Sequence, residues 1–359
     1  MRRDDAFRLA MLAPVAWRTP PRHYGPWERV TSLLTEELVA RGIDVTLFAT
    51  GDSLTAGSLR SVCAKGYEED REVDAKALEA LHIASLFEAA EEFDLIHNHF
   101  DFLPLTYSRL VATPMITTIH GFSSPKILPV YKAYDDHVAY ISISDADRSD
   151  ELTYLATIHH GIDIERFTYR ESPGSYLLFF GRFHHDKGAA DAVRIARATG
   201  LPLIMAGIIQ DRDYFAEHVE PYLADGSIRY VGSVGPDERD ELLGNARALL
   251  HPIHFAEPFG LSVVEAMACG TPVIAYDRGS MPELIEEGGN GLLVRNVEEA
   301  VEAVGRIESI DRRRCRETVE RRFTAQRMAD EYIRAYARLL DRDDLLRFLA
   351  PDSRHAEGV

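Results

Sequence analysis

Short apolar segments alternate with helical patterns along the whole chain. In the first half, strands are expected at about 7–13, 45–49, 94–97, 115–119 and 138–142, with helices at about 26–41 and 75–91. In the second half, a new series of strands is expected at about 176–180, 203–206, 228–231, 248–251 and 273–275. Such alternation is typical of βαβ units, in which a helix connects parallel strands. The sequence therefore predicts an α/β protein with parallel sheets.

The two series are separated by a helix-breaking stretch, residues 168–175, which includes Pro173 and Gly174. We place a domain boundary there and predict one domain over 1–170 and a second over 171–334. A chain of 359 residues is long enough to give each domain its own hydrophobic core. After Gly305 the chain becomes helical and rich in arginine, and these arginines are expected on solvated helix surfaces.

Charge and composition exclude several kinds of partner. The net charge of −18 argues against binding to nucleic acid or to anionic lipid. Three widely spaced cysteines indicate reduced thiols. Asp4, Asp5 and Arg8 interrupt the apolar start of the chain, so a first β-strand is expected there and not a signal peptide. No apolar run approaches the ~20 residues of a membrane-spanning helix, so we expect a cytoplasmic protein without integral membrane contact.

Two carboxylates, Glu257 and Glu265, flank a turn at 259–261 where a helix is expected to begin. Backbone amides at a helix N-terminus favour anions, and phosphate is the usual guest. Because phosphate would repel Glu257, this residue should face a neutral, hydroxylated group. Glu265, on the helix, can accept hydrogen bonds from a vicinal diol. Phosphates, a hexose and a ribose are the three parts of a sugar nucleotide.

A second pattern lies between the strand expected at 176–180 and a helix beginning near Ala189. Arg182 and Lys187 both fall in this strand-to-helix loop, where doubly wound α/β sheets bind ligands. Lys187 is the last of five lysines in a chain that otherwise uses arginine for positive charge. The planar guanidinium and the compact ammonium together suit a diphosphate. Taken alone, either residue would more readily be interpreted as a solvated surface charge.

These motifs resemble a known family. The chain reads Gly181-Arg182, then Lys187-Gly188, then Glu257-Pro-Phe-Gly-Leu, and finally Glu265-Ala-Met-Ala-Cys-Gly-Thr-Pro-Val-Ile-Ala275. In this order they resemble the retaining glycosyltransferases of family 4, which are glycogen-synthase-like. The resemblance implies the GT-B architecture, two Rossmann-like domains facing across a cleft. It also implies that the final helix, about 335–359, crosses back to the first domain.

The resemblance implies an activity as well. We expect a metal-independent, retaining transfer of a hexosyl group from a nucleoside diphosphate sugar to an acceptor hydroxyl, with no cofactor. A UDP-glucose-type donor is favoured over GDP-mannose, and the acceptor is expected to be a small soluble sugar, polyol or natural product. The second domain would bind the nucleotide sugar and the first would handle the acceptor. A nucleotide-sugar epimerase and a catalytically silent, nucleotide-binding subunit are the alternatives.

The resemblance also implies roles for the individual residues that match the family's motifs. Glu257 would hold hexose hydroxyls and Glu265 the ribose diol, while His120, at a strand end, would contact the sugar. The alternative for His120 is a hydrogen bond to nearby backbone. The predicted catalytic residues are His120, Glu257, Arg182 and Lys187. The predicted donor-binding residues are Gly25, Gly181, Arg182, Lys187, Gly207, Val231, Gly232, Val234, Glu257, Phe259, Gly260, Leu261 and Glu265. The predicted acceptor-side residues are Tyr24, His97 and His99, the two histidines being as readily structural as functional.

Some patterns depart from the family or point elsewhere. Relatives often carry Gly-Gly where this chain has Gly25-Pro26, so one phosphate-binding amide is missing, unless Pro26 is simply the first residue of a helix. The Asp-x-Asp segments at 145–147 and 211–213 are expected to cap or start helices and not to bind metal. Histidine pairs such as His184-His185 lack a cysteine or a helical partner, so no metal site is predicted.

Overall fold

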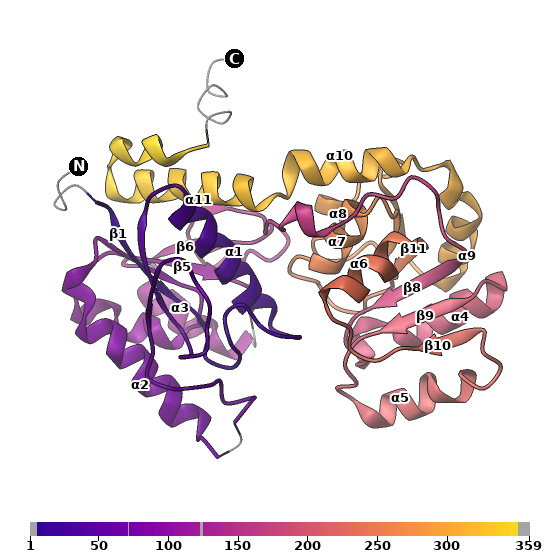
Figure 1. The fold of residues 1–359 in the computed structure, drawn as a ribbon, viewed down its shortest axis with the longest axis horizontal. Helices are drawn as coiled ribbons and strands as arrows, with labels where there is room; N and C mark the ends of the chain where they lie inside the picture. The colour runs from indigo at the N-terminus through magenta and orange to yellow at the C-terminus, as the bar shows by residue number, and fades with distance from the viewer. Residues whose placement is uncertain (1–5, 71, 123–124, 351–359) are drawn as a thin grey trace. The chain divides into compact units, whose positions relative to one another are not determined.

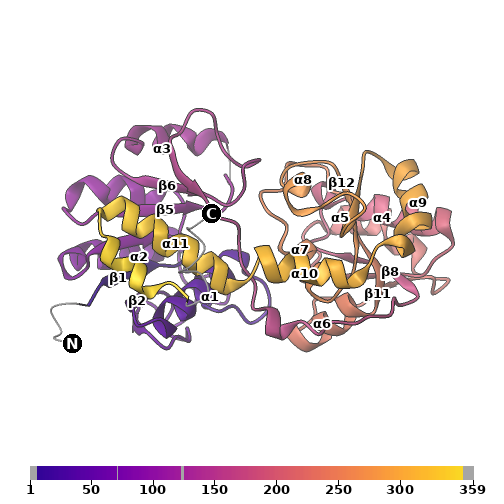
Figure 2. The same cartoon turned by 90° about the horizontal axis from the view of Figure 1, so that it is seen from above.

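The structure, a computed structural model, describes residues 6–70, 72–122 and 125–350. The chain divides into two compact units, each built around its own sheet. Unit 1 combines Met1–Ser144, Arg148–Gly161 and Ala325–Val359. Unit 2 combines Asp145–Asp147 and Ile162–Thr324. Figures 1 and 2 show the two units in indigo to purple and in pink to orange, with the yellow end of the chain divided between them.

Unit 1 contains a parallel sheet of seven strands in the order β3-β2-β1-β4-β5-β6-β7. The strands are β1 (Arg8–Leu12), β2 (Asp44–Phe48), β3 (Ser58–Arg60), β4 (Leu95–Asn98), β5 (Met115–Ile119), β6 (Ala139–Ser142) and β7 (Tyr154–Thr157). The α-helices are α1 (Pro26–Ala40), α2 (Ala75–Glu88), α3 (Leu128–Tyr134) and α11 (Ala325–Leu340). Helix α11 packs against α1, as both views show (Figures 1 and 2).

Unit 2 contains a parallel sheet of six strands in the order β10-β9-β8-β11-β12-β13. The strands are β8 (Tyr176–Phe180), β9 (Leu203–Ala206), β10 (Ile228–Tyr230), β11 (Ala246–His251), β12 (Val273–Tyr276) and β13 (Gly291–Val294). The α-helices are α4 (Ala189–Thr199), α5 (Arg212–His218), α6 (Pro236–Gly244), α7 (Leu261–Ala268), α8 (Met281–Leu284), α9 (Val297–Arg306) and α10 (Arg312–Arg322). Helices α4 and α9 pack together, as do α7 and α10.

The predicted fold class is confirmed, because each unit is a parallel α/β sheet of the Rossmann-like kind. The central strands are mostly apolar runs, and every residue of β5 and β12 is buried, including Thr117 and Thr118. Such runs arise because helices cover both faces of a parallel sheet. Three strands were not predicted: β3, β7 and β13. Two of the three residues of β3 are exposed, since it lies at the edge of the sheet and carries no apolar run.

The division between the units differs from the predicted positions. The chain enters unit 2 at Ile162, not near 170, and returns to unit 1 at Ala325, not near 335. The segment before β8 belongs to unit 2 because it is bonded to that unit: the Arg170 amide donates to the Cys269 carbonyl at 3.0 Å. The last part of the predicted returning helix, residues 351–359, lies outside the described residues.

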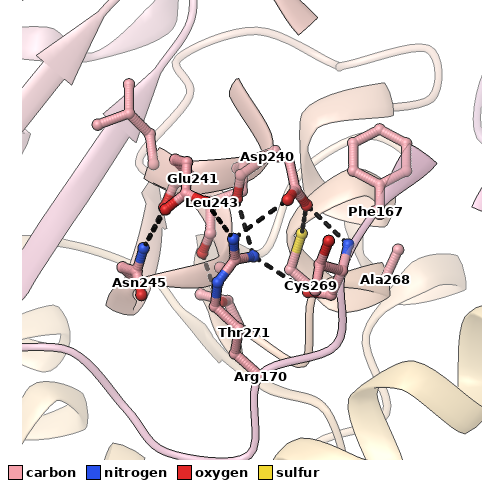
Figure 3. A network of polar contacts seen from close by, with 12 residues as sticks. Phe167, Arg170, Asp240, Glu241, Leu243, Asn245, Ala268, Cys269 and Thr271 are labelled. Atoms are coloured by element: carbon pink, nitrogen blue, oxygen red, sulfur yellow. Dashed lines mark hydrogen bonds and ion pairs between the residues drawn. The ribbon is translucent and has the colours of Figure 1, made fainter. Parts of the chain in front are cut away.

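A polar network secures this entering segment (Figure 3). The Arg170 guanidinium donates to the Asp240 carboxylate at 3.1 Å and to the Glu241 carboxylate at 2.9 Å. The Thr168 amide and the Cys269 thiol also bond Asp240, at 2.7 and 3.4 Å. Asp240 lies on α6 and Cys269 directly follows α7, so the network fixes α6 and α7 relative to each other.

Two expectations about charged residues are wrong. Arg312 is not on a solvated surface but buried, where it donates to the Gly244 carbonyl at 2.8 Å and to the Ala246 carbonyl at 3.1 Å. The Asp-x-Asp segment at 145–147 caps no helix: it forms a turn whose Asp145 amide donates to the Glu283 carboxylate at 3.0 Å. Asp211 does cap α5, as predicted, by accepting from the Tyr214 amide at 3.0 Å.

Candidate active site

The loop after β8 is packed tightly against the loop after β11. Gly188 has a positive φ of 72° and directly precedes α4. A Cβ atom at this position would lie 1.8 Å from the Pro252 carbonyl oxygen, so only glycine fits. The His254 amide also donates to the Asp186 carbonyl at 2.7 Å. These contacts bring two predicted site segments together at the carboxyl ends of adjacent strands.

Lys187 and Glu257 meet where these two loops join. The Lys187 ammonium contacts the Glu257 carboxylate, and the two side chains are only 14% and 13% exposed. The ammonium also lies 4.6 Å from the centre of the Phe255 ring. His251, the last residue of β11, places its Nε2 atom 3.7 Å from the same carboxylate. His251 and Phe255 were not predicted as site residues, although His251 carried the signal of a strand-end histidine.

The surroundings of Glu257 keep it ionised. Burial alone would raise its pKa, but the neighbouring His251 and the positive charge of Lys187 outweigh burial and lower the pKa to about 2. An ionised carboxylate is acceptor-only, with two oxygens that can receive several hydroxyl donors. Glu257 is therefore equipped to bind hydroxyl groups at any pH near neutrality.

Arg182 lies in the same loop but has a different partner. Its guanidinium contacts the side-chain oxygen of Gln210, which follows β9, and the residue is half-buried. The loop thus offers two cations, one paired with a carboxylate and one with a neutral amide. The amide leaves the charge of Arg182 uncompensated by this contact.

The turn before α7 is anchored by hydrogen bonds from Ser280. Gly260 precedes α7 with a φ of 100°, and the buried Phe259 accepts a hydrogen bond at its carbonyl from the Ser280 hydroxyl at 2.6 Å. The Ser280 amide donates to the Glu257 carbonyl at 2.9 Å. This anchoring fixes the turn from Glu257 to Leu261, the first residue of α7.

Glu265 is buried on α7 and ion-paired. Its carboxylate lies 3.0 Å from the guanidinium of Arg239 on α6, and the side chains are 4% and 13% exposed. Arg239 also lies over the Phe180 ring at 5.2 Å. Arg239 was not predicted, because its pairing depends on the packing of α6 against α7 and not on sequence spacing.

The predicted donor-binding segments that follow β9 and β10 lie side by side. The Gly207 amide donates to the Gly232 carbonyl at 2.8 Å, and the Val231 amide to the Met205 carbonyl at 3.0 Å. A Cβ atom at Gly207 would lie 1.9 Å from the Gly181 carbonyl oxygen. The backbone of the predicted residues 181, 207, 231 and 232 is thereby brought together, with Val234 buried nearby in sequence.

In unit 1, the predicted His99 and His120 form a buried row with His160, which was not predicted. His99 Nδ1 lies 2.9 Å from His120 Nε2, and His120 Nδ1 lies 3.3 Å from His160 Nε2. Trp27 of α1 stacks on the His120 ring with centroids 5.4 Å apart. The alternative of a backbone hydrogen bond for His120 thus gives way to bonds with two other imidazoles.

His97 belongs to a second buried group. Its Nδ1 atom is 2.7 Å from the Tyr336 hydroxyl and its Nε2 atom is 2.8 Å from the Thr118 hydroxyl. Thr118 in turn bonds the Tyr332 hydroxyl at 2.8 Å. Since Tyr332 and Tyr336 lie on α11, His97 connects the sheet to this helix. These contacts favour the structural interpretation of His97.

Burial keeps these histidines neutral. Desolvation, with the neighbouring imidazoles adding to it, holds the pKa of His97, His99 and His120 well below its usual range. The same causes lower the pKa of His160 to about 3. A buried neutral imidazole offers one donor and one acceptor, and no charge.

The segment at Gly25 begins α1 as the simpler interpretation of Pro26 predicted. Gly25 precedes the helix with a φ of 145°, and Pro26 is its first residue. Glu28, in the first turn, is buried, and burial raises its pKa to about 7 although its own amide and that of Trp17 donate to it. The amides at this helix start are thus partly used by the protein itself. Tyr24, a predicted acceptor-side residue, is half-buried just before the turn.

One possible cation-binding group emerges that the sequence did not predict. The ligand atoms of His184, His185 and Asp186 lie within 4.8 Å of one another. The Asp186 carboxylate is 3.2 Å from His184 Nδ1 and 2.8 Å from His185 Nε2. His185 is exposed, and all three ligands come from consecutive residues of one loop, so the geometry of the group is not enforced by packing.

Two α/β units with parallel sheets define the GT-B class, and solved structures superpose on nearly the whole chain. Sucrose-phosphate synthase from Thermosynechococcus elongatus does so with a TM-score of 0.75 and 20% identity, covering 93% of this chain and 99% of that chain. Anabaena HepE in complex with UDP and glucose does so with a TM-score of 0.70 and 18% identity, covering 92% and 99%. The GT-B architecture is therefore confirmed.

Sequence comparison gives the family. The profile of the glycosyl transferases group 1 matches residues 162–322, and that of Glycosyltransferase Family 4 matches residues 27–166. The chain belongs to the group 1 glycosyltransferases of family 4. Glycogen synthase from Mycobacterium tuberculosis is 29% identical over 233 residues, covering 55% of this chain. The match spans 56% of that relative's length. Among the described residues, no helix combines the length and apolar character needed to cross a bilayer.

Proposed function

We propose that this protein is a retaining glycosyltransferase that moves a hexosyl group from a nucleoside diphosphate sugar to an acceptor hydroxyl. A UDP-glucose-type donor is favoured, with GDP-mannose second, and no divalent metal takes part. The observation that carries the proposal is the junction of Lys187 and Glu257. It places a cation for phosphate and an ionised acceptor for hydroxyls next to each other, at the carboxyl ends of β8 and β11.

The charges of the reaction explain the roles of these residues. As the bond to the leaving group breaks, negative charge grows on the diphosphate and positive character on the anomeric carbon. Arg182, Lys187 and the amides at the start of α7 stabilise the diphosphate. Glu257 holds hexose hydroxyls and Glu265 the ribose diol. His120, neutral because it is buried, contacts the hexose without repelling the positive anomeric carbon.

The choice of donor and acceptor rests on likeness and charge. HepE, a structural relative, binds UDP and glucose, which favours a uridine nucleotide here. The acidic chain favours a small, neutral acceptor such as a sugar, polyol or natural product. No nucleophilic side chain is assigned to the reaction, so we propose a front-face substitution without a covalent intermediate.

Thermal unfolding with different nucleotides tests the proposal. UDP, GDP, ADP and TDP at about 1 mM, each with a chelator, are compared for their effect on Tm. We expect UDP to raise Tm most, and incubation with UDP-glucose and candidate sugars to give a glycoside of unchanged anomeric configuration. Stabilisation by no nucleotide would contradict the proposal, and an epimerised sugar nucleotide formed without acceptor would replace it.

A further inference from the structure

Asp191 is a buried carboxylate in the first turn of α4. Its side chain is only 9% exposed, and both of its oxygens face protein groups. Oδ2 accepts from the Tyr276 hydroxyl at 2.7 Å and lies 3.0 Å from His254 Nε2. Oδ1 accepts from the Arg194 guanidinium at 3.2 Å. Asp191 can therefore act on a substrate only through its neighbours.

A carboxylate at this position is not explained by stability alone. The inward-facing residues beside it on α4, Ala192 and Val193 among them, are apolar. Replacing a buried ion pair by apolar residues of similar volume is often neutral or stabilising, so such a pair is weak evidence for stability. The contacts of Asp191 therefore matter for the geometry that they impose.

His254, in the loop after β11, is held at three points. Its side chain contacts Asp191, its amide donates to the Asp186 carbonyl at 2.7 Å, and its carbonyl accepts from the Arg278 guanidinium at 3.1 Å. The Tyr276 ring packs edge-on against the His254 ring, with centroids 5.7 Å apart. Both the backbone and the side chain of His254 are thereby fixed.

The segment that begins at His254 leads directly to the ion pair of the site. Phe255, the next residue, places its ring centre 4.6 Å from the Lys187 ammonium. Glu257, three residues after His254, contacts the same ammonium. A displacement of His254 would therefore displace Glu257 with respect to Lys187.

Asp191 is bound to the Lys187 loop as well. Its amide donates to the carbonyl of Gly188, the residue after Lys187, at 3.0 Å. The backbone of Asp191 thus follows the loop that carries Lys187, whereas its side chain holds the loop that carries Glu257.

We propose that Asp191 is a positioning residue that, through His254 and Tyr276, holds Glu257 in place beside Lys187. The effect on transfer rests on the proposed function, whereas the effect on the loop does not. Because a misplacement of about 1 Å can cost about 100-fold in rate, such positioning acts on the transfer step. UDP should bind with little change, since its proposed contacts do not include Glu257.

Hydrogen exchange tests the effect on the loop without any assay of transfer. Local opening of the loop exposes its amides, among them the His254 amide that is bonded to Asp186. In Asp191→Leu, we expect the amides of segment 253–257 to exchange at least about fivefold faster than in the wild-type protein, as measured by mass spectrometry. In Asp191→Asn, whose side-chain oxygen can still accept from the Tyr276 hydroxyl, exchange should stay within about twofold of the wild type. Equal exchange in all three proteins would overturn the proposal.

A double-mutant cycle tests whether Asp191 acts through Glu257. Asp191→Leu should lower kcat by about tenfold, with less than about twofold change in donor KM, and Asp191→Asn should recover most of the loss. In a Glu257→Ala background, Asp191→Leu should lower kcat by less than about twofold, because the side chain that it positions is gone. Equal losses in the two backgrounds, or an asparagine variant no better than leucine, would contradict the positioning role.

Asp330→Leu is the matched control. Asp330 is 3% exposed, against 6% for Asp191, but it pairs with Arg41 in unit 1 at 3.0 Å. This substitution should leave exchange in segment 253–257 unchanged, and any loss in kcat should be the same with and without the Glu257 side chain.

The outcomes separate this proposal from the proposed function. Faster exchange in Asp191→Leu, together with a wild-type protein that transfers no hexose, would contradict the proposed function and leave the positioning of the loop intact. If Asp191→Leu fails to fold, which its melting curve shows, Tyr276→Phe takes its place in both tests, because it removes only the hydroxyl bonded to Asp191.

Discussion

The Lys187 ammonium contacts the Glu257 carboxylate at the junction of two loops, and both side chains are mostly shielded from solvent. Each charge offsets the desolvation cost of the other in a site with little water. A diphosphate that approaches Lys187 therefore meets a cation already held in place, and a sugar hydroxyl meets a carboxylate already ionised. The ion pair therefore places the proposed phosphate-binding group directly beside the proposed hydroxyl-binding group.

Replacing Lys187 is expected to remove donor binding and transfer together. Lys187→Met keeps the length of the side chain but loses the charge, so kcat/KM should fall by about 100-fold or more. UDP should then raise Tm much less than in the wild-type protein. Lys132→Met is the control, because Lys132 pairs with Glu151 on an exposed surface. Unchanged transfer in Lys187→Met would remove Lys187 from the site.

Replacing Glu257 should separate binding from transfer. Glu257→Gln keeps the shape and one acceptor oxygen, so UDP should still raise Tm, whereas the hexosyl transfer rate should fall by roughly 10-fold to 100-fold. Because the pKa of Glu257 is about 2, its ionisation should not appear in the rate profile at any pH above about 4. Wild-type transfer rates in Glu257→Gln would sink the assignment of this residue.

Glu265 is expected to recognise the ribose. The wild-type protein should be stabilised more by UDP than by 2′-deoxy-UDP, and Glu265→Gln should abolish that difference by weakening UDP alone, by about tenfold in Kd. Glu92→Gln serves as the control, since Glu92 is exposed and pairs with Arg60 in unit 1. A variant that still prefers UDP would show that another group binds the ribose.

Acid should destabilise unit 1 through its buried histidines. Their pKa values are lowered in the folded protein, so folding is favoured above the unfolded pKa of about 6.5 and weakens as the pH falls below it. Each histidine adds about 1.4 kcal/mol of lost stability per pH unit until its folded pKa is reached. Urea unfolding between about pH 8 and 5 measures the slope, and a flat profile would contradict the burial of neutral rings.

Glu28 should change the pH dependence of folding stability in the opposite direction. Burial raises its pKa to about 7, so the charged form weakens the folded protein above that pH, and the loss is relieved as the pH falls towards 4.5. Glu28→Gln should therefore stabilise the protein at pH 8, by roughly 2 kcal/mol, and have little effect near pH 5. The same urea measurements on the variant test this, and a loss of stability at pH 8 would refute it.

Removal of metal should leave the proposed activity unchanged. The cations of Arg182 and Lys187 supply the charge that a metal supplies in other transferases, so chelator should not lower transfer. Zinc added to the chelated protein tests the group at 184–186, where His185→Ala should abolish any binding. Transfer lost in chelator and restored by zinc would overturn the metal-independent mechanism.

The fold was predictable from sequence where burial leaves a periodic signal. Strands β5, β8 and β9 were predicted with the bounds they have, because a parallel strand covered on both faces is a mostly apolar run. The edge strand β3 leaves no such run. The predicted unit boundary lies too late in the chain. Pro173 and Gly174 mark a loop, whereas the change of unit depends on which sheet the flanking residues contact.

The site was predictable one side chain at a time but not as contacts. Arg182, Lys187 and Glu257 were found from their loops, yet the partner roles of His251 and Arg239 follow from β8 pairing with β11 and from α6 lying beside α7. His160 carried a usable signal: like His99 and His120, it lies just beyond the carboxyl end of a strand of one sheet. Such residues converge whatever their distance in sequence.

The close packing of Gly188 on Pro252, with the bond from His254 to Asp186, has a kinetic meaning. Because these contacts hold the two loops together, their side chains are already in position before a nucleotide binds. Donor capture should then resemble the docking of a rigid body, with little ordering entropy lost and an association rate governed by diffusion and orientation. Discrimination among nucleotides would then depend on their dissociation rates.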